Sequence, residues 1–241
     1  MRLAIVSDVH GNLAALDAVI SDLDAQAPDL VVHGGDLAVI GPKPAEVMDV
    51  IRERGWPGVL GNTDEIVFDP SGQTEQERRA PKLRDWLHVL FEVLMPWTRD
   101  RLGDDRVDWL RKLPKQWRQD RLLLVHAMPD DLWRAPMPDG SAQELKQTYG
   151  GRDADIIVYG HIHRPYVRLL GGLTVSNSGS VGLPYDRDLR ASYLLIENRV
   201  ANIRRVEYDL ERAAHDALEV GFPYAGSLAQ VQQAGRFTPP E

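Results

Sequence analysis

The sequence contains five short apolar runs, each followed by a side chain that can bind a metal ion. After the first run, residues 2–6, come Asp8 and His10, which point to the same side of an extended backbone because strand side chains alternate with a period of two. The later runs lead to a carboxylate, an amide and three imidazoles, which are Asp36, Asn62, His126, His161 and His163. Loops at the carboxyl ends of strands carry the ligand sites of α/β proteins. The pattern therefore predicts one sheet edge at which nitrogen and oxygen donors meet.

Asp8 and His10 alone would fit an ordinary strand end with a solvated carboxylate and an unrelated histidine, because such short patterns are common. The recurrence of four similar runs argues against that interpretation. His33 lies inside an apolar run and is interpreted as a packed residue or as a support for a ligand, and His88 and His215 fall in predicted helices as surface or packing residues.

Charge and composition narrow the range of functions. The net charge of −8 and the sequence pI of about 5.4 argue against a general surface for nucleic acid or for an anionic membrane. No stretch approaches the ~20 apolar residues of a membrane span, and no signal-peptide pattern precedes the first run, so we expect a cytoplasmic protein. The absence of cysteine excludes disulfides and thiolate ligands, which leaves metals that oxygen and nitrogen bind.

The N-terminal part alternates between strand and helix patterns. Apolar residues recur at helical spacing from Leu13 to Leu23, and Pro28 ends that segment. A strand at 30–33, a helix at about 44–54 and a strand at 57–60 complete a β-α-β-α-β order. This order predicts a parallel sheet with helices on its outer face.

The remainder of the chain has a different pattern. Residues 73–113 predict a helical insert, with helices around 75–95 and 104–112 and no ligand motif. Two hairpins, at 166–176 and 191–208, are expected to form a second, largely antiparallel sheet. The C-terminal tail at about 209–241 is expected to be helical, starting with a helix at about 209–219. With 241 residues, the chain is most simply one domain, residues 1–241.

The ordered motifs resemble those of the calcineurin-like metallophosphoesterases. They are Asp8-Val9-His10, Gly35-Asp36, Gly61-Asn62, His126 and Gly160-His161-Ile162-His163. Residues 34–42 and 177–184 are similar to the branch of small, single-domain bacterial and archaeal predicted phosphodiesterases. The resemblance covers roughly residues 1–210. It implies a mixed α+β fold, a four-layer α-β-β-α sandwich of two packed mixed sheets with flanking helices.

The resemblance also implies two divalent metal ions that share Asp36. Their ligands would be Asp8, His10, Asp36 and His163 for one ion, and Asp36, Asn62, His126 and His161 for the other. Asp36, Asn62 and His126 would then be catalytic, with a hydroxide that bridges the ions as nucleophile. Two carboxylates leave about two positive charges on the pair, which suits a phosphate ester. Mn²⁺ is the expected metal, with Fe, Zn²⁺ or Ni²⁺ as alternatives.

One residue departs from the pattern of many phosphatases and phosphodiesterases in this superfamily. A histidine that helps to protonate the leaving group follows the Gly-Asn pair in those enzymes, whereas Thr63 and Asp64 follow it here. The general acid is therefore missing or moved, with Asp64, His33 or a water molecule as substitutes. A general acid contributes typically 10²–10⁴-fold to the rate.

The substrate side of the site is less defined by sequence. Arg164, directly after the paired histidines, either faces the cleft or forms a structural ion pair, and Gly179 lies in a loop that either approaches the metals or is a plain surface turn. Most of the tryptophans are expected to pack in the core, but Trp133 is a candidate for the cleft wall or for stacking on a base. Arg78 and Arg79 are interpreted as a solvated face.

The expected function is a binuclear phosphodiesterase that acts on a small phosphate ester. Two alternatives are kept. The first is a phosphomonoesterase or protein phosphatase, and the second is a metal-binding scaffold for protein interactions with little catalysis. The oligomeric state and the natural substrate stay open.

Overall fold

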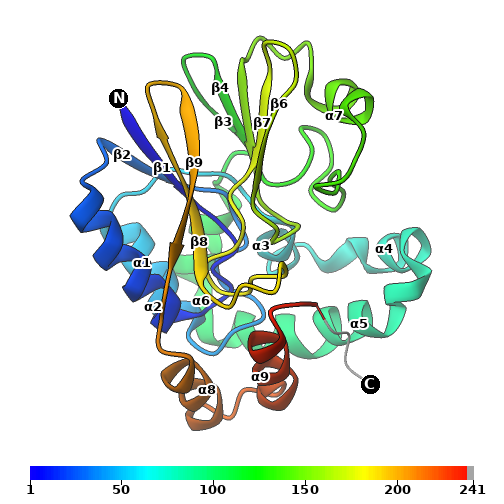
Figure 1. Cartoon of the computed structure of the whole chain (residues 1–241). Coiled ribbons are helices and arrows are strands. Elements are labelled where there is room, and N and C mark those ends of the chain that lie inside the picture. Colours follow the sequence, from blue (N-terminus) through cyan, green and yellow to red (C-terminus); the bar gives the residue numbers. More distant parts are fainter. Residues whose placement is uncertain (238–241) are drawn as a thin grey trace.

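The computed structural model describes residues 1–237, which form two β-sheets with helices on both outer sides (Figure 1). The strands of the first sheet lie in the order β2-β1-β8-β9 and span Leu30–His33, Arg2–Val6, Ala191–Glu197 and Val200–Val206. β1 is parallel to β2 and antiparallel to β8, and β8 is antiparallel to β9. The first sheet is therefore mixed.

The second sheet is also mixed. Its strands lie in the order β3-β4-β5-β7-β6 and span Gln116–Gln119, Leu122–Val125, Ile156–Tyr159, Thr174–Asn177 and Tyr166–Leu169. β4, β5 and β7 run parallel to one another, and the edge strands β3 and β6 are antiparallel to their neighbours. The parallel strands of both sheets have their carboxyl ends at the same edge, and most of the predicted ligands come directly after those ends.

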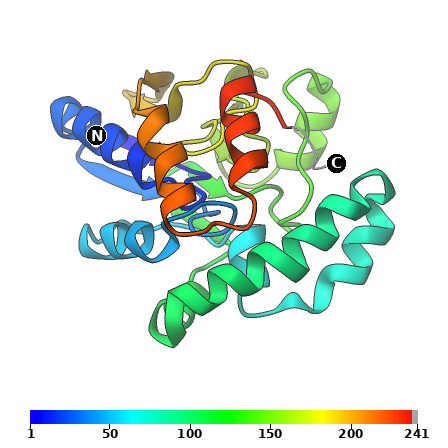
Figure 2. The same cartoon turned by 90° about the horizontal axis from the view of Figure 1, so that it is seen from below.

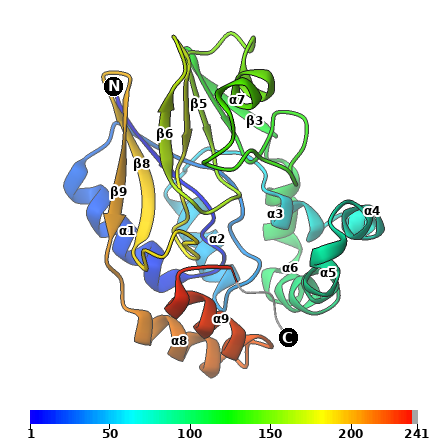
Figure 3. The same ribbon diagram turned by 45° about the vertical axis from the view of Figure 1, so that its right-hand side comes forward.

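The side chains of each strand alternate between the two faces of its sheet, so the described residues form three apolar cores: one between the sheets and one on the outer face of each sheet. Leu3 and Ile5 of β1 pack with Leu124 of β4 and Val158 of β5 between the two sheets. The opposite face of β1 packs against helices α1 (Leu13–Gln26) and α2 (Pro44–Glu53), and the outer face of the second sheet packs against α7 (Ala142–Tyr149). Figure 3 shows α1 beside the first sheet and α7 beside the second. The expected four-layer arrangement is thus confirmed.

The expected second sheet, built from the two hairpins, is wrong. Both hairpins form, but β6-β7 joins the second sheet beside β5, and β8-β9 joins the first sheet beside β1. The expected strand at 57–60 is also absent: this segment pairs with β2 only through an isolated bridge between His33 and Gly58. The ladder stops there because the N–H of Leu60 donates to the carbonyl of Pro114 instead.

Residues 70–94, which we call the helical arm, extend from the body beside the edge where the ligands lie (Figures 1 and 2). The arm contains a 3₁₀ turn (Pro70–Gly72), α4 (Gln73–Arg79), a 3₁₀ turn (Pro81–Leu83), α5 (Arg84–Val89) and a π-helical turn (Leu90–Leu94). The predicted helix at 75–95 is broken because Pro81 disfavours a helical backbone at Ala80, where φ is −130°.

Four further helices of the described part of the chain pack around the two sheets. α3 (Asn62–Ile66) is a short helix that starts at a predicted ligand, and α6 (Met95–Arg111) is kinked at Gly103, so that its second half corresponds to the predicted helix at 104–112. α8 (Leu210–Glu219) and α9 (Ala225–Ala234) form the C-terminal helices and lie side by side in Figure 2. The end of the predicted tail, residues 238–241, lies outside the described residues. Within residues 1–237, no helix combines the length and apolar character that a bilayer crossing requires.

Candidate metal centre

All of the predicted ligands come together at one end of the two sheets. Asp8 and His10 follow β1, Asp36 follows β2, His126 follows β4, and Asn62 opens α3. The paired histidines 161 and 163 follow β5. Six of the seven side chains are buried, at 4% exposure or less, and His161 is partly buried. The structure thus brings the seven predicted side chains together at one edge of the sheets.

The backbone at these positions is unusual. Most of the ligand residues have a positive φ, between 49° and 65°, and these are Asp8, His10, Asp36, His161 and His163. A positive φ is uncommon outside glycine and is tolerated best by asparagine, aspartate and histidine. Hydrogen bonds between loops hold this conformation: the N–H of Asp8 donates to the carbonyl of Gly35, and the N–H of His10 donates to that of Asp36. Each ligand turn is therefore stabilised by a neighbouring one.

One group of donors surrounds the imidazoles of His10 and His163. Their Nε2 atoms lie 3.2 Å apart, and Nε2 of His163 lies 3.2 Å from Oδ1 of Asp8. The Nδ1 atoms contact backbone carbonyls, of Val39 at 2.7 Å and of Leu183 at 2.6 Å. Because a carbonyl only accepts, each Nδ1 carries the proton, and each Nε2 turns a lone pair toward the other. Such facing lone pairs, next to a carboxylate, fit a cation.

A second group surrounds Asn62. Its Oδ1 lies 2.9 Å from Nε2 of His126 and 3.0 Å from Nδ1 of His161. The Nδ1 of His126 donates to the carbonyl of Gly34 at 2.8 Å, which again leaves Nε2 with its lone pair toward the site. Imidazole nitrogen and amide oxygen are both suitable ligands for a first-row divalent metal.

Asp36 lies between the two groups. Its Oδ2 is 3.7 Å from Nε2 of His10, and its Oδ1 is 3.5 Å from Nε2 of His126. The N–H of Thr63 donates to the same Oδ1 at 2.9 Å, which fixes the orientation of the carboxylate. One oxygen therefore faces each donor group.

Burial and charge set the protonation of these side chains. Burial lowers the pKa of His10 to about 4 and that of His161 to about 4, with nearby imidazoles acting in the same direction, so both are neutral at pH 7. Burial also opposes ionisation of Asp8, but the neighbouring His163 outweighs it and lowers the pKa of this carboxyl. At His126 the effect of burial is outweighed by Asp36 and Asp8, which raise its pKa. The site thus favours positive charge between its carboxylates.

Neither Asp64 nor His33, the two residues predicted as substitutes for the general acid, lines the cleft. Asp64 is fully buried and accepts the N–H groups of Asp36, Leu37 and Gly61 at 2.8, 2.9 and 3.1 Å, so it ties two ligand loops together. Burial and the adjacent carboxylate of Asp36 raise its pKa to about 7. His33 is fully buried, and its ring lies 5.8 Å from that of Trp109. Both are therefore placed as structural residues.

The candidate metal centre opens into a cleft of about 450 Å³. Trp133 and Arg164 line it, in agreement with one of the sequence interpretations of each, and the Nε–H of Arg164 donates to the carbonyl of Tyr185. Arg79, interpreted from sequence as solvated, instead lines the cleft and pairs with Asp131.

Sequence reasoning missed several residues of the cleft wall. They come from the helical arm, the loop after His126, the loop after β7 and the C-terminal segment, and they include Trp86, Leu87, Arg134, Tyr185 and Phe237. None follows an apolar run, and Phe237 is distant in sequence from every ligand. A helical pattern beside the ligand edge was the only available signal, and it did not identify individual residues.

Gly179 does not line the cleft, so the expected substrate contact is not found. It is buried with a φ of +74°, and a Cβ atom there would lie 2.0 Å from Oγ of Ser192 and 3.0 Å from Pro165. Its neighbour Gly182 is equally confined, because a Cβ atom would lie 1.9 Å from the carbonyl oxygen of Val9, between two ligands. Close packing behind the ligand loops explains both glycines.

Gly179→Ala is expected to lower the free energy of unfolding by about 1–3 kcal/mol, because it combines a strained φ with a steric clash. The measurement is chemical unfolding of the variant and the parent. Gly172→Ala is the matched control, since Gly172 has a φ of +93° but no neighbour within 4 Å of a Cβ atom. Equal losses in the two variants would show that packing at Gly179 contributes nothing.

Comparisons with known proteins agree with this geometry. The model of the calcineurin-like phosphoesterase superfamily domain matches residues 1–199. The chain is 26% identical over 234 residues to uncharacterized protein MJ0912 of Methanocaldococcus jannaschii, covering 88% of this chain and 89% of that protein. It is 25% identical over 216 residues to phosphodiesterase YfcE of Escherichia coli, covering 84% and 91%.

Solved structures show the same fold. A metallophosphoesterase from Sphaerobacter thermophilus superposes with a TM-score of 0.78 at 26% identity, covering 98% of this chain and all of that one. Hypothetical protein PH1004 from Pyrococcus horikoshii OT3 superposes with a TM-score of 0.81, covering 97% and 98%. At 18% identity, the second likeness concerns the fold alone.

Proposed function

This chain is a phosphoester hydrolase of the calcineurin-like phosphoesterase superfamily, and we propose that it cleaves phosphodiesters at a centre of two divalent cations. The position of Asp36 is the observation that carries the proposal. Each of its carboxylate oxygens faces a different group of donors, at 3.7 Å from His10 and 3.5 Å from His126. A shared carboxylate is the means by which proteins hold two cations at ~3.5–4 Å.

The remaining ligands divide between the two cations as their contacts do. Asp8, His10 and His163 would hold the first ion with Asp36. The Nε2 atom of His10 lies 3.2 Å from that of His163 and 3.7 Å from Oδ2 of Asp36. The Nε2 atom of His163 lies 3.2 Å from Oδ1 of Asp8. Asn62, His126 and His161 would hold the second ion with Asp36. When bound, such cations lower the pKa of water and stabilise the charge on a phosphoryl group.

The protein's own residues would orient the ester and exclude water. Within residues 1–237, Arg134 and Arg164 line the cleft and form no ion pair with a carboxylate, so their charges are available to phosphoryl oxygens. Apolar side chains of the helical arm, Leu83, Leu87 and Leu90, line the same cleft and would exclude water from the ester.

A diester suits this site better than a monoester. The relative YfcE is named a phosphodiesterase, and a diester carries one negative charge, which matches a centre with a limited positive excess. The helical arm and Phe237 also bound a cleft of about 450 Å³, a size typical for a small ligand. A small phosphodiester is therefore the proposed substrate.

Metal removal tests the proposal. The chain is treated with a chelator and reloaded with Mn²⁺, Fe²⁺, Zn²⁺ or Ni²⁺, and bound metal is measured by elemental analysis. We expect about two ions per chain and loss of hydrolysis of bis-p-nitrophenyl phosphate on chelation, with recovery on reloading, most fully with Mn²⁺. Full activity without metal, or a preference for p-nitrophenyl phosphate, would contradict the proposal.

A further inference from the structure

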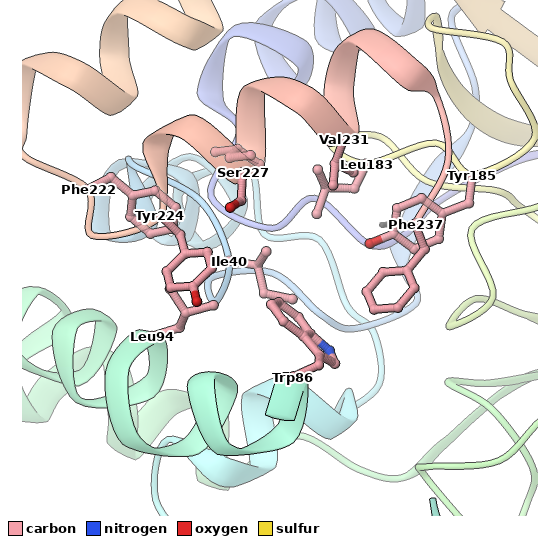
Figure 4. A pocket seen from close by; sticks show the side chains of 11 residues that line it. Ile40, Trp86, Leu94, Leu183, Tyr185, Phe222, Tyr224, Ser227, Val231 and Phe237 are labelled. Carbon is pink, nitrogen blue, oxygen red and sulfur yellow. The ribbon is translucent and has the colours of Figure 1, made fainter. Parts of the chain in front are cut away.

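A continuous series of aromatic rings leads from a predicted metal ligand into the cleft. The ring of Tyr185 stacks on that of His163, with centroids 4.3 Å apart and planes at 16°. The ring of Phe237 lies 5.7 Å from that of Tyr185, and the ring of Trp86 lies 5.7 Å from that of Phe237. Figure 4 shows Trp86, Tyr185 and Phe237 around a small apolar cavity, and the same three residues also line the cleft. The organic part of a bound ester would therefore meet aromatic surface directly beside the metal centre.

These rings come from three separate parts of the chain. Trp86 belongs to α5 in the helical arm, Tyr185 to the loop between β7 and β8, and Phe237 to the segment after α9. Phe237 also lies beyond residues 1–199, the part that the superfamily model matches. The wall is thus completed by a residue outside the part of the chain that the superfamily model matches.

The position of Tyr185 is fixed relative to the metal centre. Its N–H donates to the carbonyl of His163 at 3.0 Å, and its own carbonyl accepts from Nε of Arg164 at 3.2 Å. The planes of Trp86 and Phe237 meet at 70°, so together they form a corner. A flat ring placed in such a corner can stack on one side chain and turn its edge to the other, and these are the arrangements that aromatic pairs prefer.

The size of the space agrees with a ring in the cleft itself. A separate apolar cavity of about 30 Å³ lies behind Trp86 and Phe237, lined by Leu94, Leu183, Phe222 and Val231 among others (Figure 4). An apolar cavity that binds benzene has a volume of roughly 150 Å³. The small cavity is therefore too small for a ring, whereas the cleft of about 450 Å³ is large enough for a ring together with a phosphate.

We propose that Trp86, Tyr185 and Phe237 form an aryl subsite, which binds a flat aromatic group of the phosphate ester beside the metal centre. The subsite determines specificity and rests on the proposed function for the position of the phosphoryl group. The aromatic group can be a substituted phenyl ring or a heterocycle, since a π-face is all that the subsite recognises.

Direct binding to the Mn²⁺-loaded protein tests the subsite. Phenylphosphonate and methylphosphonate share one anionic head group and are not cleaved, so calorimetric titration compares only the organic part. We expect the parent to bind phenylphosphonate about tenfold more tightly. Phe237→Ala and Trp86→Ala should each reduce this ratio to about threefold or less, whereas Phe237→Tyr keeps it. Arg236→Ala is the matched control, because Arg236 is exposed and does not line the cleft.

Two outcomes would overturn the subsite. One is equal affinity of the parent for the two phosphonates, and the other is an unchanged ratio in both alanine variants with normal thermal unfolding. Titration of a nucleoside 5′-phosphonate alongside phenylphosphonate distinguishes a heterocycle from a simple ring. Calorimetry needs no turnover, so a protein that prefers phenylphosphonate but cleaves no diester would contradict the phosphodiesterase proposal and leave the subsite intact.

Discussion

Asp36→Asn is expected to lower kcat/KM for bis-p-nitrophenyl phosphate by at least about 10³-fold and to reduce bound metal at both positions. Even residues that only hydrogen-bond a metal ligand typically change metal affinity by 10–100-fold, and Asp36 faces both donor groups. The amide replaces one anionic oxygen and removes the charge that both cations would share. Elemental analysis and steady-state kinetics on the same preparation measure the two effects.

The control for this variant is Asp120→Asn. Asp120 is exposed in the turn between β3 and β4, away from the ligand edge, and asparagine tolerates its φ of 49°. This variant should keep its metal and its activity. Equal metal content in Asp36→Asn and the parent would argue against a shared carboxylate. Loss of a single ion would assign Asp36 to one cation only.

The rate should also depend strongly on the basicity of the leaving group. The side chain that follows Asn62 is Thr63, whose hydroxyl is buried and finds no hydrogen-bond partner among residues 1–237. The carboxylate of Asp64 is held by three backbone N–H groups. Among residues 1–237, Asp36 is the single carboxyl group that lines the cleft, so no carboxylic acid outside the candidate ligands is placed to protonate the departing oxygen. Alkyl esters should therefore be cleaved at least about 10²-fold more slowly than aryl esters. Methyl aryl phosphodiesters whose phenols differ in pKa measure this dependence, because all of them keep the same methyl group and only the substituents on the departing phenol change.

Thr63→His provides the matched test of the missing acid. An imidazole at this position should accelerate the esters with the poorest leaving groups most, by up to about 10²-fold, and change the best aryl esters little. A flat dependence on leaving-group pKa in the parent, with the chemical step shown to limit the rate, would mean that another residue already supplies the proton.

The places of the candidate ligands at the sheet edge were predictable because they depend on local sequence. A strand places side chains with a period of two and ends at its carboxyl edge, so Asp8, Asp36 and His126 follow from the apolar runs themselves. The partner of each hairpin was not predictable, since both hairpins carry the same local pattern. Pairing of β8 with β1, and of β7 with β5, depends on contacts between residues far apart in the chain.

The residues of the cleft wall were also not predictable from local sequence. Arg79 has the sequence pattern of a solvated helix face, and only the approach of Asp131 from the loop after His126 places it in the cleft. Phe237 reaches the cleft because α9 packs against α8 and the N–H of Arg187, in the loop between β7 and β8, donates to the carbonyl of Gly235. Local periodicity contains no information about either approach.

The left-handed backbone at five of the candidate ligands restricts which metal sites this scaffold can host. Aspartate, asparagine and histidine are the non-glycine residues that adopt such a φ most readily, and the ligands at those five positions are all aspartate or histidine. Glutamate or cysteine at Asp8, Asp36 or His163 would have to overcome the backbone as well as a change in reach, at a cost of order 1–3 kcal/mol per position. Redesign for a softer or larger cation should therefore begin at Asn62 and His126, the two ligands outside the left-handed region.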